Sequence, residues 1–175
     1  TSRVMILNDL GDVCDESEIL TYALEAKNIC TKNYNENLSN REKIIYLKSL
    51  ALALNNIAYV HIQNQNLERA LKYSLISLRI DSIVNGTGMG TTLNNIAYIY
   101  KSQGNIKMAL HYNYLSLKLQ EIRNNKTGIA NSSLNIGVIY ENINDFNNAE
   151  QFYKKALDFF TELNPTSFST STKDI

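Results

Sequence analysis

Asparagine side chains recur at one register of this chain and offer the most regular chemistry in the sequence. Asn56, Asn95 and Asn135 stand 39 and 40 residues apart, each within a stretch whose apolar residues have helical spacing. Asparagine is a poorer helix former than alanine by about 0.5 kcal/mol, so its repeated use inside helices suggests a purpose. Two interpretations stay open. The amides bind a ligand, or they bond to adjacent helices and to solvent.

Catalytic and metal-binding chemistry finds no support in the residue pattern. His61 and His111 are the only histidines, and neither has the Cys, His or Asp neighbours at the spacing that a zinc site needs. The glycine-rich segment 86–90 lacks the preceding strand and the following Lys-Ser/Thr of a phosphate loop, so we interpret it as a joint. His61 takes the place that Tyr100 and Tyr140 have in later copies, which predicts a packing role. We expect no enzyme, no catalytic residue, no cofactor and no metal.

Charge and composition exclude further classes of partner. The 17 basic residues balance the 17 acidic ones, so the chain has no electrostatic footprint for nucleic acid or for an anionic membrane surface. The apolar runs are too short to cross a bilayer. Cys14 and Cys30 are expected to be reduced and packed as small hydrophobic residues. Reduced thiols favour the cytoplasm, whereas a segment of a membrane-bound sensor would be periplasmic.

The elements that must position these side chains follow from a repeat of about 40 residues. Apolar residues at i, i+3, i+4 and i+7 predict paired helices in each copy. Asn66, Asn105 and Asp145 occupy equivalent positions and are predicted to cap the second helix of each pair. Small residues are expected where the helices cross, because close crossings leave no room for larger ones. These are Ala58, Ala97 and Gly137 on the first helices and Ala70, Ala109 and Ala149 on the second.

The repeat boundaries follow from turn-forming residues. Links are predicted at 85–88 and 124–128, and a polar loop at 33–40 lengthens a degenerate first copy. Pro165 ends the last helix, and the polar tail 166–175 is expected to be disordered. We therefore predict one array over residues 1–165, with repeats at about 1–40, 49–86, 89–126 and 129–164.

The repeated wording resembles a known family. Leu54-Asn55-Asn56-Ile57-Ala58-Tyr59, followed by Asn66 and Ala70-Leu71, is similar to the tetratricopeptide repeat (TPR), and the resemblance covers about Val4 to Asn164. The unit is longer than the usual 34 residues and resembles the arrays of kinesin light chains and of bacterial signalling proteins. The resemblance implies an all-α fold, a right-handed α-solenoid of about four helical hairpins.

The resemblance also implies a binding surface. First helices of such arrays line a concave groove, where an asparagine hydrogen-bonds the backbone of a bound peptide. The matching positions are Asn56, Asn95 and Asn135, with Tyr59 and Tyr98 facing the same groove and Lys101 and Glu141 near its edge. The clamp of lysine and arginine that holds a terminal carboxylate in some members is absent, since Leu52, Thr91 and Asn131 stand at first-turn positions.

Function follows as an expectation from the resemblance. The chain would be a protein–protein interaction module that binds a protein or peptide segment, with no contact to nucleic acid or membrane. The alternative is a regulatory or sensory segment of a larger bacterial signalling protein, such as a histidine kinase or a transcriptional regulator. Self-association through the ends of the array is a further expectation, because solenoid ends need polar caps.

Overall fold

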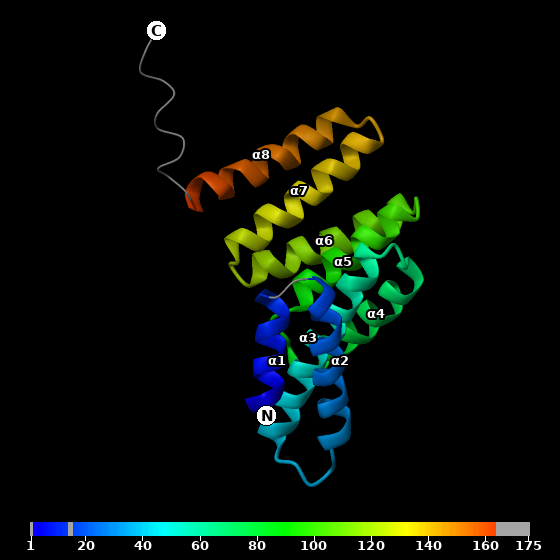
Figure 1. The fold of residues 1–175 in the computed structure, drawn as a ribbon. Helices are drawn as coiled ribbons and strands as arrows, with labels where there is room; N and C mark the ends of the chain where they lie inside the picture. Colours follow the sequence, from blue (N-terminus) through cyan, green and yellow to red (C-terminus); the bar gives the residue numbers. More distant parts are fainter. Residues whose placement is uncertain (1, 14–15, 164–175) are drawn as a thin grey trace, which may run out of the picture. The chain divides into compact units, whose positions relative to one another are not determined.

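A computed structural model describes residues 2–13 and 16–163 of the chain, and helices with short connections account for all of them. No strand occurs in this part of the chain. The helices are α1 (Ser2–Val13), α2 (Glu16–Asn33), α3 (Asn40–Gln63), α4 (Leu67–Val84), α5 (Met89–Ser102), α6 (Ile106–Ile122), α7 (Lys126–Asn142) and α8 (Phe146–Leu163) (Figure 1). The predicted tail at 166–175 lies outside the described residues.

The helices belong to two compact units, Thr1–Ile99 and Tyr100–Ile175. In the first unit α1 packs on α2, α2 on α3 and α3 on α4, and α1 also contacts α3. In the second unit α6 packs on α7 and α7 on α8. Packing between neighbours in sequence is typical of repeat arrays, in which each unit buries its apolar face against the next.

Polar side chains start the second helices as predicted. The side-chain oxygens of Asn66, Asn105 and Asp145 accept hydrogen bonds from the backbone N–H groups three residues later, at 3.3, 3.1 and 3.2 Å. Each cap satisfies one of the N–H groups that the first turn of a helix leaves unpaired. Ser39 and Glu42 form a reciprocal capping box at the start of α3. The Ser-Asn-Arg-Glu sequence carries this signal, which sequence reasoning missed.

The residue before each of these caps has a left-handed backbone. Gly104, the predicted helix stop, has a φ of 76°. Its equivalents in the other copies are not glycines, since Gln65 has a φ of 56° and Asn144 a φ of 60°. Asparagine tolerates this region well, but glutamine does not. The turn geometry therefore recurs in all three copies even where the residue type does not favour it.

One predicted link is wrong in part. The connection 85–88 is confirmed between α4 and α5, but residues 126–128 belong to α7 and not to a loop. The Asn125 side chain accepts from the N–H of Gly128 at 3.1 Å and thereby starts the helix two residues after α6 has ended at Arg123. Glycine at 128 serves close packing here, since a Cβ would lie 2.4 Å from the Gln120 side chain.

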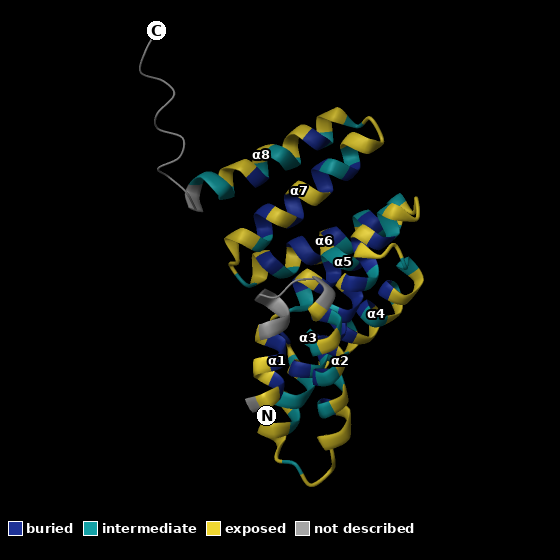
Figure 2. Cartoon of the chain, viewed as in Figure 1, coloured by how far each residue is buried: buried dark blue, intermediate teal, exposed yellow. Residues whose placement is uncertain are grey.

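Small residues fill the helix crossings as predicted. Ala58, Ala97, Ala70 and Ala109 are fully buried, and Figure 2 shows buried residues running along one face of successive helices. At Gly137 an added Cβ would lie 2.6 Å from ring carbons of Tyr153 on α8. The close approach of α7 to α8 therefore requires glycine, as ridge-into-groove packing predicts for a tight crossing.

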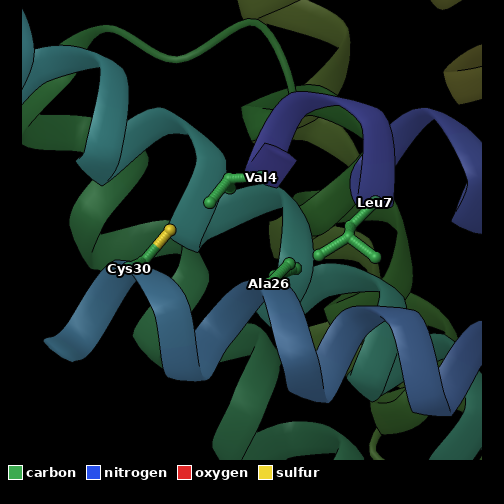
Figure 3. Packing of buried hydrophobic residues seen from close by; sticks show 5 residues of the cluster. Val4, Leu7, Ala26 and Cys30 are labelled. Atoms are coloured by element: carbon green, nitrogen blue, oxygen red, sulfur yellow. The ribbon is translucent and has the colours of Figure 1, made fainter. Parts of the chain in front are cut away.

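The degenerate first copy has a core of its own. Val4 and Leu7 of α1 face Ala26 and Cys30 of α2, and Ala53 of α3 completes the cluster (Figure 3). Cys30 is a free thiol, and burial raises its pKa to about 11. The prediction of a reduced, buried thiol is confirmed for Cys30, whereas Cys14 lies outside the described residues. No helix in the described part of the chain is long and apolar enough to span a bilayer.

Candidate binding surface

The predicted asparagines lie on three first helices and differ in their surroundings. Asn56 on α3 and Asn95 on α5 are half-buried, and Asn135 on α7 is exposed. Asn95 donates through Nδ2 to Oδ1 of Asn55 at 3.0 Å, and the Thr92 hydroxyl donates to the same oxygen at 3.3 Å. For Asn95 the structure therefore supports bonding between adjacent first helices, which was one of the two interpretations.

Tyrosines present exposed aromatic surface one turn beyond two of these asparagines. Tyr59 is 36% exposed and Tyr98 is 43% exposed, although both lie in helices with a well-buried opposite face. An exposed tyrosine offers a large apolar ring and a hydroxyl that donates and accepts hydrogen bonds. Such rings are enriched at sites where proteins bind one another.

The predicted edge residues lie in the second unit. Lys101 is half-buried at the end of α5, and Glu141 is exposed near the end of α7. Glu141 accepts a hydrogen bond of 2.5 Å from the hydroxyl of Tyr153 on α8. Burial and this hydrogen bond raise the pKa of Tyr153 to about 12. Glu141 thus has a partner within the last hairpin, which sequence reasoning did not foresee.

Stacked rings join the two helices of each hairpin. His61 lies 5.6 Å from Tyr73, Tyr100 lies 5.6 Å from Tyr112, and the interplanar angle is 11° in both pairs. In the last hairpin, Tyr140 and Phe152 lie 5.8 Å apart at 15°. The prediction that His61 packs like its tyrosine counterparts is confirmed. Among the described residues, no group of three or more Cys, His, Asp or Glu side chains could hold a metal ion.

A cavity of about 230 Å³ was missed by sequence reasoning. It lies in the first unit, lined by residues of α1 and α3, the end of α4 and the link that follows. Two of its polar residues, Asn8 and Asp81, are buried at 3% and 4% exposure. A signal for Asn8 was available, because it precedes Gly11 by the same three residues that separate Asn55 from Ala58.

Comparison with known proteins identifies the repeat. The family model described as tetratricopeptide repeat matches residues 49–122 and 88–162. No curated protein matches. Among solved structures, BtubC (BKLC) from P. vanneervenii is similar over 92% of this chain and 64% of its own, with 19% identity and a TM-score of 0.72.

Two further solved structures share the fold. Aspartyl phosphate phosphatase F from Bacillus subtilis matches over 94% of this chain and 40% of its own, with 16% identity and a TM-score of 0.77. The repeats of a putative kinesin light chain from Podospora anserina match over 93% of this chain and 95% of their own, with 9% identity and a TM-score of 0.56. The chain thus spans less than two thirds of the first and second of these structures. Together the matches confirm an all-α solenoid of helical repeats.

Proposed function

Because the chain belongs to the tetratricopeptide repeat family, we propose that it binds a peptide or protein segment along the exposed face of its first helices. Membership of this family supports a role as a protein-interaction module. The finer proposal concerns which residues make contact. We assign the main contacts to Tyr59 and Tyr98, with Asn56 and Asn135 bonding the backbone of the bound segment.

The exposure of Tyr59 and Tyr98 carries this proposal. Both rings stand one helical turn from a half-buried asparagine on the same helix, so each helix offers an aromatic surface beside an amide. A tyrosine has only two side-chain torsions, so fixing it in a complex loses little conformational entropy. Neighbouring amides supply donors and acceptors that match a peptide backbone. With a net charge of zero, apolar contact and hydrogen bonds would outweigh electrostatic steering.

Asn95 has a different place in the proposal. Its Nδ2 group donates to Asn55, so replacing it would disturb the packing of α3 against α5. Loss of binding in an Asn95→Ala variant would therefore not distinguish a contact from a structural effect. Asn56 and Asn135 are better choices, together with the two tyrosines.

Affinity capture from a lysate of the source organism tests the proposal. The full chain is compared with a Tyr59→Ser/Tyr98→Ser variant and an Asn56→Ala/Asn135→Ala variant, and bound proteins are identified by mass spectrometry. Tyr34→Ser is the matched control, because Tyr34 is also 43% exposed but lies in the loop after α2. We expect a partner that wild type and Tyr34→Ser retain and that both double variants lose while their helical circular dichroism is unchanged. Equal retention by every variant would place the interaction elsewhere.

A further inference from the structure

The cavity in the first unit contains a buried acceptor without a donor. Asn8 on α1 donates through Nδ2 to the backbone carbonyl of Ser49 on α3 at 3.1 Å. A carbonyl oxygen only accepts hydrogen bonds, so the NH₂ end of the amide must face Ser49 and its orientation is fixed. The other end, Oδ1, is buried and has no hydrogen-bond partner among the residues that the structure describes.

An unpaired buried acceptor is unfavourable, since leaving one unsatisfied costs about 1–3 kcal/mol. The residue that carries it also lines the cavity, together with Ser49. A group that enters this cavity and donates an N–H or O–H to Oδ1 would remove the penalty. An apolar ligand would leave the oxygen unpaired, so the site favours hydrogen-bond donors.

The charges around the cavity favour a cation. Asp81 on α4 and Asp9 on α1 line it, and Lys48 on α3 is the one basic residue of the lining. Asp81 is buried, whereas Asp9 and Lys48 are exposed at the surface. The lining therefore carries one net negative charge, and its buried charge is a carboxylate. An anionic ligand would be repelled by Asp81, and a buried carboxylate strengthens hydrogen bonds to a cationic donor.

Glycine in the following link keeps Asp81 in place. A Cβ at Gly86 would lie 1.8 Å from the Asp81 carboxylate, so only glycine lets the link pass so close. The space that remains is large enough for a side chain. A cavity of about 150 Å³ holds a benzene molecule, so about 230 Å³ has room for a guanidinium or ammonium group and part of its alkyl stem.

We propose that this cavity binds a guanidinium or primary ammonium group, with Asn8 Oδ1 accepting one N–H and Asp9 and Asp81 balancing the charge. The group is an arginine or lysine side chain of the bound segment, and on this one point the inference rests on the proposed function. The chemistry of the cavity itself is tested without any partner.

Titration of the ¹⁵N-labelled full chain with Nα-acetyl-arginine amide tests the site. The uncharged analogue Nα-acetyl-citrulline amide has almost the same shape and serves as the matched probe. We expect saturable shifts of the Asn8 side-chain NH₂ signals and of the Gly86 and Gly88 backbone amides. Charge-assisted hydrogen bonds are roughly twice as strong as neutral ones, so we expect the citrulline analogue to bind about tenfold more weakly or less.

Exposed charges around the cavity allow variants that keep the fold. Lys48→Glu should tighten binding of the arginine probe several-fold, and Asp9→Asn should weaken it. Lys72→Glu makes the same charge change on an exposed residue of α4 that does not line the cavity, and it should have a smaller effect. Asn8→Leu should abolish the specific shifts, provided that circular dichroism shows it folded.

Three outcomes would overturn the proposal: no saturable shift at these positions, equal binding of the two probes, or equal effects of Lys48→Glu and Lys72→Glu. The first would indicate that only water fills the cavity. Failure here is distinguishable from failure of the proposed function. Binding of the probe without any captured partner overturns the proposed function alone, and a captured partner without probe binding overturns the cavity proposal alone.

Discussion

His61 stacks on Tyr73 where the later hairpins stack two rings that carry no imidazole. Burial, and to a lesser degree the positive charge of Arg69, lower the pKa of His61 below its ordinary value of 6.5. The folded chain therefore binds a proton at this site less readily than the unfolded chain does. One side chain thereby makes the stability of its hairpin depend on pH.

We expect the free energy of unfolding to fall as the pH drops below 6.5, the ordinary pKa of the His61 side chain. A base whose pKa is lowered by folding stabilises the folded state fully above its unfolded pKa, and that contribution is lost towards the folded pKa. His61→Tyr, which copies Tyr100 and Tyr140, should remove this part of the decline. Urea denaturation of both proteins at several pH values measures it. If the two curves stay parallel below pH 6.5, another group is responsible.

At the residue scale, register was easier to predict than environment. The positions of Asn56, Asn95 and Asn135 on first helices follow from helical periodicity. The bond from Asn95 to Asn55 does not, because it depends on the distance between two side chains on different helices. The same reason explains why the unpaired Oδ1 of Asn8 was not foreseen. A single sequence contains the period of its helices but not the separation of their side chains.

At the scale of the elements, the turn between the helices of a hairpin is the most repeated device. Caps at Asn66, Asn105 and Asp145 were predictable because their mechanism is local and lies within four residues. Helix ends were less so. The start of α7 was wrongly placed because Lys126-Thr127-Gly128 looks like a turn, and only the Asn125 cap reveals that it is helical.

Gln65 is the unfavourable member of the left-handed turn series. An L-residue with a Cβ is disfavoured in this conformation by about 1–2 kcal/mol, whereas glycine is not. We expect Gln65→Gly to raise the free energy of unfolding by about 0.5–1 kcal/mol, after the greater entropy of glycine in the unfolded chain is allowed for. Chemical denaturation measures the change.

Gln103→Gly is the control for this substitution. Gln103 stands directly before Gly104 and is not among the residues with positive φ. Glycine there should leave stability unchanged or lower it. Stabilisation by both substitutions, or by neither, would mean that the left-handed backbone at Gln65 is not the source.

For the whole molecule, stability is expected to be local, because each helix packs mainly on its neighbours in sequence. Ile136 on α7 and Ile57 on α3 are both fully buried, one in each compact unit. Truncation of either to alanine removes buried methyl groups and should cost about 2–5 kcal/mol. We expect Ile136→Ala to lower amide hydrogen-exchange protection first in α6, α7 and α8.

Ile57→Ala should give the complementary map, with protection lost first in α2, α3 and α4. Hydrogen exchange followed by mass spectrometry compares the two variants with wild type. A uniform loss of protection over all helices in both variants would show one cooperative unit and contradict the expectation. The fold class at this scale was predictable because a fixed period of helical hairpins admits few architectures.

The ring pairs that join the hairpins also make the chain readable by light. It contains 11 tyrosines and no tryptophan, so any tryptophan introduced would be its sole indole. The stacked positions Tyr73, Tyr112 and Phe152 recur once in each hairpin. Three single-tryptophan versions of the protein would each report, through the wavelength and intensity of one emitting group, on one hairpin alone.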